Sequence, residues 1–150
     1  MHKTLDNIKK LKHLILIVAI LIVASCSQPR KEFAIDSSES KAALKADLEL
    51  TEADVTKEVH YWLEDDSSSV AYFKTDSSTI NRVIERLSME PDTVRKYVWI
   101  PENSPVWFSP SIEPTDTRNR TWIKESSERK VFLQINEQRN ACYFANLKWK

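Results

Sequence analysis

Few residues in this 150-residue chain have the type and spacing that catalysis requires. His60 is the only histidine beyond residue 13, and it stands between Val59 and Tyr61 in a stretch rich in β-branched and aromatic residues. A histidine base with serine and acid partners is defined by geometry and not by sequence spacing, so no triad can be assembled around it. We therefore interpret His60 as a solvated strand residue and predict no catalytic residue.

The acidic run Glu64-Asp65-Asp66, which precedes three serines, could supply oxygen ligands to Ca²⁺. Calcium loops alternate their ligands and need a glycine at the sharp turn, but this chain contains no glycine. Zinc sites need three or four Cys or His ligands, and residues 27–150 hold only His60 and Cys142. The missing glycine also excludes the glycine-dependent phosphate-binding loops. We predict no metal site and no cofactor, and we interpret the acidic run as a hairpin loop.

The first 25 residues have the composition of an export signal. Residues 14–24 are 11 apolar residues without a break, close to the apolar length of a signal peptide. As a helix they would extend about 16 Å, which is short of a bilayer core of about 30 Å. The basic residues that precede them are Lys3, Lys9, Lys10 and Lys12.

The residues that end this segment resemble the cleavage site of bacterial lipoproteins. That site has an aliphatic residue, two small residues and a cysteine, and Val23, Ala24, Ser25 and Cys26 fill the four places. The resemblance implies removal of residues 1–25, a diacylglycerol thioether on the Cys26 sulfur and a palmitate-type fatty acid on the new amine, which together give stable anchoring. It covers residues 1–26 only. The alternative is a short N-terminal membrane helix that happens to carry a cysteine at its end.

The composition of the remaining 125 residues fits one exported domain with a tether. Without the signal segment the chain has 18 basic and 21 acidic residues, a formal net charge of −3. We predict no nucleic-acid partner, because such a partner would require a clustered basic face. The predicted location is the bacterial cell envelope, with the outer membrane favoured because Ser27, and not aspartate, follows the lipidated cysteine.

Residues 26–50 are predicted to be the lipidated cysteine and a flexible tether, and residues 51–150 a small domain. The tether prediction follows from the polar, serine-rich stretch around residues 36–41, which can bury little apolar surface. Within the tether, residues 41–49 could form a marginal helix. A flexible coil of about 24 residues would extend roughly 25–30 Å on average. Such a tether would lift the domain off the membrane surface.

The periodicity of residues 51–150 predicts an α+β fold. Ile80, Val83, Ile84 and Leu87 form one apolar stripe of a helix that begins at Asp76. We expect a single antiparallel sheet of about five strands in the order ββαβββ, with this one amphipathic helix packed on it. The expected strands are residues 56–63, 70–75, 120–124, 130–136 and 141–147, with a further short candidate at 97–100.

A proline-rich loop over residues 101–119 is the feature that stands out, since long loops in small domains are often functional. Trp107 and Phe108 lie within it, and Trp99 and Trp122 flank it, so these four form a candidate binding surface. The interpretation that we favour is that the loop folds back over the open face of the sheet and completes the core. Cys142 is expected to be buried, because Tyr143 and Phe144 follow it.

The predicted function is that of a membrane-anchored, non-enzymatic module that binds a protein or another envelope component. The membrane itself is the first partner, through the lipid on Cys26. An alternative is a sugar or peptidoglycan binder that uses exposed aromatic residues. An envelope enzyme that uses Cys142 or acidic residues is the weakest alternative.

Overall fold

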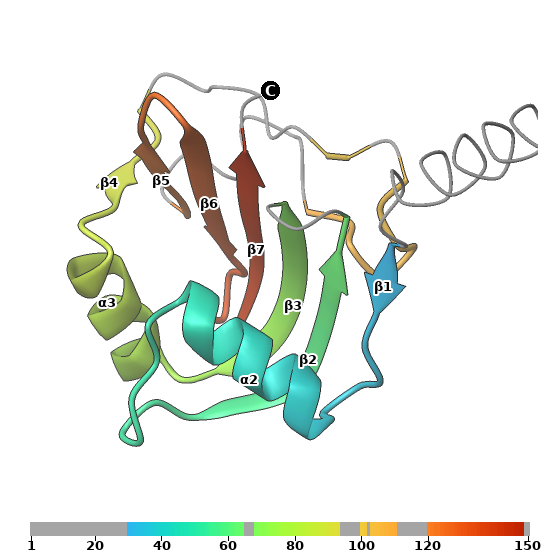
Figure 1. Ribbon diagram of the computed structural model, residues 1–150. Helices are drawn as coiled ribbons and strands as arrows, with labels where there is room; N and C mark the ends of the chain where they lie inside the picture. The colour runs from blue at the N-terminus through green and yellow to red at the C-terminus, as the bar shows by residue number, and fades with distance from the viewer. Residues whose placement is uncertain (1–29, 65–67, 94–99, 102, 111–119, 149–150) are drawn as a thin grey trace, which may run out of the picture.

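Seven antiparallel strands form one sheet in the spatial order β1-β2-β3-β7-β6-β5-β4 (Figure 1). This computed structural model describes residues 30–64, 68–93, 100–101, 103–110 and 120–148. The sheet places the last strand of the chain in its centre, between β3 and β6. The strands are β1 (Lys31–Glu32), β2 (Thr56–Leu63), β3 (Ser69–Thr75), β4 (Glu90–Pro91), β5 (Thr121–Glu125), β6 (Arg129–Ile135) and β7 (Ala141–Lys148).

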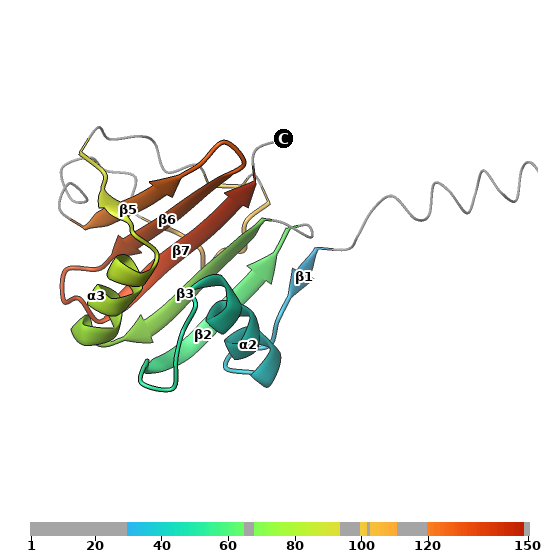
Figure 2. The ribbon, with the colours of Figure 1, turned by 60° about the vertical axis from the view of Figure 1, so that its left-hand side comes forward.

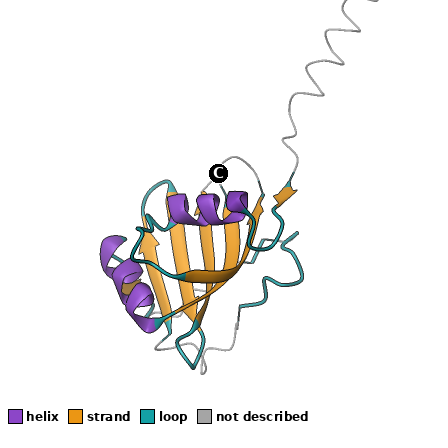
Figure 3. Cartoon of the chain, turned by 90° about the horizontal axis from the view of Figure 1, so that it is seen from below, coloured by secondary structure: helices purple, strands orange, loops and turns teal. Residues whose placement is uncertain are grey.

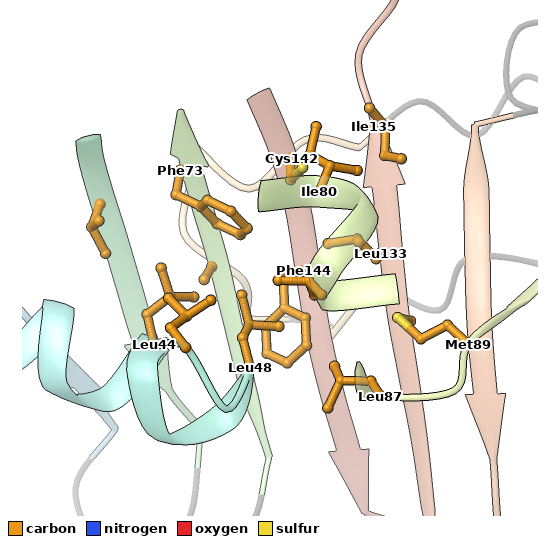
Figure 4. Close-up of a cluster of buried hydrophobic side chains, with 14 of the residues drawn as sticks. Leu44, Leu48, Phe73, Ile80, Leu87, Met89, Leu133, Ile135, Cys142 and Phe144 are labelled. Carbon is orange, nitrogen blue, oxygen red and sulfur yellow. The ribbon is translucent and has the colours of Figure 1, made fainter. Parts of the chain in front are cut away.

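Two helices, α2 (Ser38–Asp47) and α3 (Ser77–Arg86), cover the same face of this sheet (Figures 2 and 3). Leu44 and Leu48 of the α2 segment point toward Phe144 of β7, and Ile80 of α3 lies over Cys142 (Figure 4). These side chains belong to one buried apolar cluster, which is the main core. We call the side covered by the helices the helical face, and the other side the second face.

Both helices begin at a side-chain cap. Before α2, the Ser37 Oγ accepts the backbone N–H of Ser40 at 3.0 Å. Before α3, Asp76 Oδ1 accepts the N–H of Thr79 at 2.7 Å. These bonds satisfy backbone donors that have no partner within the helix. Asp76 confirms the helix start that the sequence predicted.

The helices end in left-handed residues, although this conformation usually favours glycine. After α3, Ser88 has a φ of 52°, and the N–H of Met89 returns to the carbonyl of Ile84 at 2.9 Å. α2 ends in the same way at Glu49, whose φ is 53°. A left-handed conformation costs a residue with a Cβ about 1–2 kcal/mol. The chain accepts this cost because it has no glycine to place there.

The predicted flexible tether over residues 26–50 is wrong for residues 30–50. This stretch contains β1 and α2, and the side chains of Leu44 and Leu48 are fully buried. Its polar composition suggested disorder, but a helix needs only one apolar face to pack on a sheet. The folded domain therefore begins near Arg30 and not near residue 51.

The other fold predictions are largely confirmed. The α+β class and the single antiparallel sheet are confirmed. Among the described residues, however, the sheet has seven strands and not about five, and two helices pack on it and not one. β1 and β4 are two-residue edge strands, too short to show an alternating pattern. Part of the strand candidate at 97–100 lies outside the described residues, and Ile100 is not in a strand.

Polar contacts fasten the N-terminal segment to the sheet. Asp36 accepts the backbone N–H groups of Glu58 and Val59, at a bulge where Glu58 has a φ of 49°. At the end of α2, Asp47 accepts the hydroxyls of Tyr61 and Ser69 at 2.7 and 2.6 Å. These bonds, together with the buried leucines, make α2 an integral part of the domain.

The turn between α2 and β2 is held by a covered carboxylate. Asp54 receives hydrogen bonds from the backbone and hydroxyl of Thr51 and forms ion pairs with Arg82 at 2.7 Å and Arg86 at 3.1 Å. Burial alone would raise the pKa of Asp54, but the backbone N–H of Thr51 and the two guanidinium groups hold that pKa well below its ordinary value. The turn is thereby joined to α3.

No helix among the described residues is both long enough and apolar enough to cross a membrane.

Candidate binding surface

One row of side chains crosses the second face of the sheet from β2 to β5. His60 lies opposite Tyr72, Tyr72 opposite Tyr143, Tyr143 opposite Gln134, and Gln134 opposite Thr121. Residues in register on neighbouring strands lie side by side on the same face. Antiparallel pairing thus aligns five residues that are up to 83 positions apart in the sequence.

Three rings of this row join two rings of the proline-rich loop in a closed circuit, which we call the aromatic cluster. The ring centroids of His60 and Tyr72 are 5.7 Å apart, and those of Tyr72 and Tyr143 are 5.1 Å apart. Phe108 meets Tyr143 edge-on at 5.8 Å and Trp107 at 6.1 Å. Trp107 closes the circuit on His60 at 5.3 Å. All five separations fall in the range of favourable aromatic pairs.

The loop is held on the second face by one buried ring and one hydrogen bond. Phe108 is 3% exposed and belongs to a second apolar cluster with Trp62, Val70 and Phe132. The Trp107 indole Nε1 donates to the Glu32 carboxylate of β1 at 2.7 Å. Because Phe108 is buried, this part of the loop completes the core, as the favoured interpretation predicted.

The remaining members of the aromatic cluster keep part of their surface in contact with solvent. His60, Tyr72, Tyr143 and Trp107 are all half-buried. Burial raises the pKa of Tyr72, with only partial opposition from Lys74, so its hydroxyl stays protonated and able to donate a hydrogen bond. The cluster thus offers flat ring faces and phenolic hydroxyls on a surface that the helices do not cover.

The structure separates the four residues of the predicted binding surface. Trp107 and Phe108 lie together on the second face, whereas Trp122 packs against the core of the helical face. Trp99 lies outside the described residues. The indole Nε1 of Trp122 is buried without a hydrogen-bond partner, which is consistent with a structural residue more than with a binding residue.

Sequence reasoning missed the strand residues of the cluster. His60 was interpreted as solvated, but it is half-buried against Trp107 and Tyr72. The alternation of β3 and β7 places Tyr72 and Tyr143 on the face away from Phe73 and Phe144, and that signal was available. Their contact was not, because it depends on β7 pairing with β3.

The structure places the thiol of Cys142 inside the main core. Cys142 is 1% exposed, and burial raises the pKa of its thiol to about 12, with a small opposing effect of Arg139. A thiol in this state is a poor nucleophile at neutral pH. Asp65 and Asp66 lie outside the described residues. Within the described part of the chain, no three His, Cys, Asp or Glu residues are grouped as metal ligands would be.

The polar group around Asp47 has catalytic residue types but a structural arrangement. Burial, and then the charge of Asp47, raise the pKa of Tyr61, so this tyrosine remains a hydrogen-bond donor to the carboxylate. Asn146 donates to the other carboxylate oxygen at 3.3 Å. The Asp47 carboxylate thus accepts hydrogen bonds from three side chains of the sheet and holds α2 in place. Because these bonds occupy both of its oxygens, it is poorly placed to activate a nucleophile.

Comparison of the chain with protein-family models, with curated protein sequences and with solved structures found no match.

Proposed function

We propose that this chain is a bacterial envelope lipoprotein, anchored through lipid on Cys26, whose domain is a non-enzymatic binding module. The Val23-Ala24-Ser25-Cys26 sequence supports the anchor, and Ser27 favours the outer membrane. The buried, weakly acidic thiol of Cys142 supports a role other than catalysis.

The observation that carries the binding role is the half-buried aromatic cluster on the second face. Aromatic side chains contribute much of the affinity at protein interfaces, because they bury a large area with few rotatable bonds. The helices leave this cluster uncovered, and Trp107 is fixed to Glu32. A protein or another envelope component is the proposed partner.

A sugar or peptidoglycan partner is the second candidate, and the same cluster favours it. The apolar C–H face of a sugar ring can stack on an aromatic face, while the hydroxyls of Tyr72 and Tyr143 bond the sugar's own hydroxyls. Such a partner requires flat, partly exposed rings beside polar groups. His60, Tyr72 and Tyr143 meet that requirement along one row.

The anchor is tested by Cys26→Ser, which removes the lipid acceptor. We expect the variant to lose incorporation of labelled fatty acid and to accumulate as the uncleaved precursor. Retained fatty-acid labelling would overturn the lipoprotein assignment. The matched control is Cys142→Ser, which should leave lipid labelling unchanged.

The binding surface is tested with a photo-activatable phenylalanine analogue at position 72 in intact cells. We expect crosslinks to a defined protein or to cell-wall fragments, and mass spectrometry separates the two candidates. The control position is Ala46, which is exposed on α2, the helix that covers the opposite face of the sheet. Equal crosslinking at both positions would show that the aromatic cluster is not a binding surface.

A further inference from the structure

The start of the folded domain leaves only a very short connection to the proposed lipid. Three residues, 27–29, separate Cys26 from Arg30, and β1 begins at Lys31. Four residue steps span at most about 14 Å when fully extended. The tether predicted from composition would have averaged roughly twice that distance. The end of the sheet at which β1 begins must therefore lie close to the membrane surface.

An exposed apolar side chain stands beside a residue that contacts β1. Glu32 is the sixth residue after Cys26, and its carboxylate binds the indole of Trp107. The loop that carries Trp107 runs beside β1 (Figure 1). Val106 directly precedes Trp107 and is 98% exposed, compared with 60% for Ile35 and 47% for Val55, the other large apolar residues exposed in the described part of the chain.

The pair Val106–Trp107 has the character of a membrane-interface contact. Tryptophan is favoured at the lipid headgroup level because it combines an apolar ring with a polar N–H. Water exposure of Val106 is unfavourable, and covering its side chain at the boundary between headgroups and acyl chains would recover part of that free energy. The i to i+3 bond from the Phe108 N–H to the Pro105 carbonyl, at 2.9 Å, forms a turn that projects Val106 outward.

Basic side chains at this end of the sheet can meet anionic lipid headgroups. A cross-strand row runs from Lys31 through Leu63, Ser69 and Asn146 to Val131, and the paired residues Arg129 and Lys148 lie beyond it. Basic residues near a membrane each contribute attraction to anionic headgroups. The described residues of this end include six basic and four acidic side chains, and Asp65 and Asp66, which lie outside the described residues, stand between Glu64 and Ser68 in the sequence. The basic residues are Arg30, Lys31, Lys124, Arg129, Lys130 and Lys148, and the acidic ones are Glu32, Glu64, Glu125 and Glu128.

We propose that the short connection holds the domain directly on the membrane, with Val106 and Trp107 in the headgroup layer. This inference depends on the proposed lipidation of Cys26, since the lipid fixes the end of the chain at the surface. It also orients the aromatic cluster. Trp107 lies at the membrane-proximal edge of the cluster, and the row from His60 to Tyr143 remains accessible from the side.

The test uses the full lipidated protein in vesicles. These contain zwitterionic phosphatidylethanolamine and anionic phosphatidylglycerol at a ratio of about three to one. Val106→Cys and Val55→Cys each receive an environment-sensitive fluorophore. Lipid occupies Cys26, and Cys142 is buried, so labelling is confined to the new cysteine. Val55 is the control because it precedes β2 at the end of the sheet away from β1.

We expect headgroup-level quencher lipids to quench the fluorophore at position 106 several-fold more strongly than the one at position 55. Equal quenching at the two positions, with both reached readily by aqueous iodide, would overturn the proposal. Mass spectrometry of the same preparation separates this failure from a failure of the anchor. Equal quenching with lipid present on Cys26 overturns only the membrane contact, whereas absence of the lipid overturns the lipoprotein assignment and this inference together.

Discussion

Asp54 shows how a single carboxylate joins two parts of the chain that are distant in sequence. Its side chain has no exposed surface, and its partners Arg82 and Arg86 come from α3. We expect Asp54→Asn to destabilise the domain by about 1.5–3 kcal/mol, the range for hydrogen bonds to a charged group. Thermal unfolding at neutral pH measures the loss. Glu52→Gln, in the same turn but at an exposed position, is the control and should leave the midpoint nearly unchanged.

The effect of Asp54 should depend on pH in a defined direction. Its folded pKa lies below its ordinary value of 3.8, so the unfolded chain binds the proton more tightly than the folded one. The stabilisation by Asp54 is therefore fully present above about pH 5 and declines as the pH falls through the unfolded value near 4. The difference between wild type and Asp54→Asn should shrink as unfolding is measured from pH 6 down to pH 3. A constant difference would contradict the assigned ion pairs.

At the scale of the elements, the residue that ends the last turn of α3 has a strained backbone conformation, which a substitution can relieve. Ser88 has a φ of 52°, a conformation in which its Cβ crowds the backbone. Ser88→Gly should raise the free energy of unfolding by about 0.5–1 kcal/mol, because relief of this crowding exceeds the extra entropy of glycine in the unfolded chain. Ser88→Ala keeps the Cβ and should give no such gain. Chemical denaturation of both variants makes the comparison, and a glycine variant no more stable than the alanine variant would rule out this explanation.

The packing of α2 tests whether the folded domain begins near Arg30, as observed, or whether residues 30–50 are a tether, as the composition predicted. Leu48 follows the last residue of α2 and is fully buried. We expect Leu48→Ala to cost about 2–5 kcal/mol, as leucine truncations in cores do. Ala42→Ser, at an exposed position of the same helix, should change the stability little. Equal melting midpoints for Leu48→Ala and wild type would mean that residues 30–50 are a tether after all.

The contrast between α2 and α3 explains which elements the sequence revealed. In α3 the apolar positions Ile80 and Val83, with Leu87 at the C-cap, recur at helical spacing after a good N-cap, so the pattern alone predicted the helix. In α2 the large apolar residues are Leu44 and, just beyond its end, Leu48, and the other residues are mostly serine, lysine and alanine. Two leucines are too few to define a period, and only the sheet beneath them makes the helix stable.

At the scale of the whole molecule, the candidate site arises from strand order, which local patterns do not encode. Each strand of the aromatic cluster was predicted within about one residue of its observed bounds. Tyr72 and Tyr143 nevertheless meet only because β7 enters the sheet beside β3. The contact of Trp107 with Glu32 joins the loop to the first strand, 75 residues earlier. Such long-range pairings depend on the packing of the entire domain and not on the composition of any segment.

The domain has three layers, namely the helices, the sheet and the proline-rich loop, and the third layer provides the last test. Phe108 is buried in the second cluster, so Phe108→Ala should cost about 3–5 kcal/mol, as large aromatic deletions do. Trp107 is half-buried and bonded at its edge, so Trp107→Ala should cost clearly less.

Thermal unfolding of the two variants beside wild type decides between a core role and a binding role for Trp107. A smaller loss for Trp107→Ala leaves much of its ring available to the membrane or to a ligand, since a half-exposed ring contributes less to folding. Equal losses would place Trp107 with Phe108 in the core and would remove it from the proposed surface. The strand residues His60, Tyr72 and Tyr143 would then be the part of the aromatic cluster left to bind a partner.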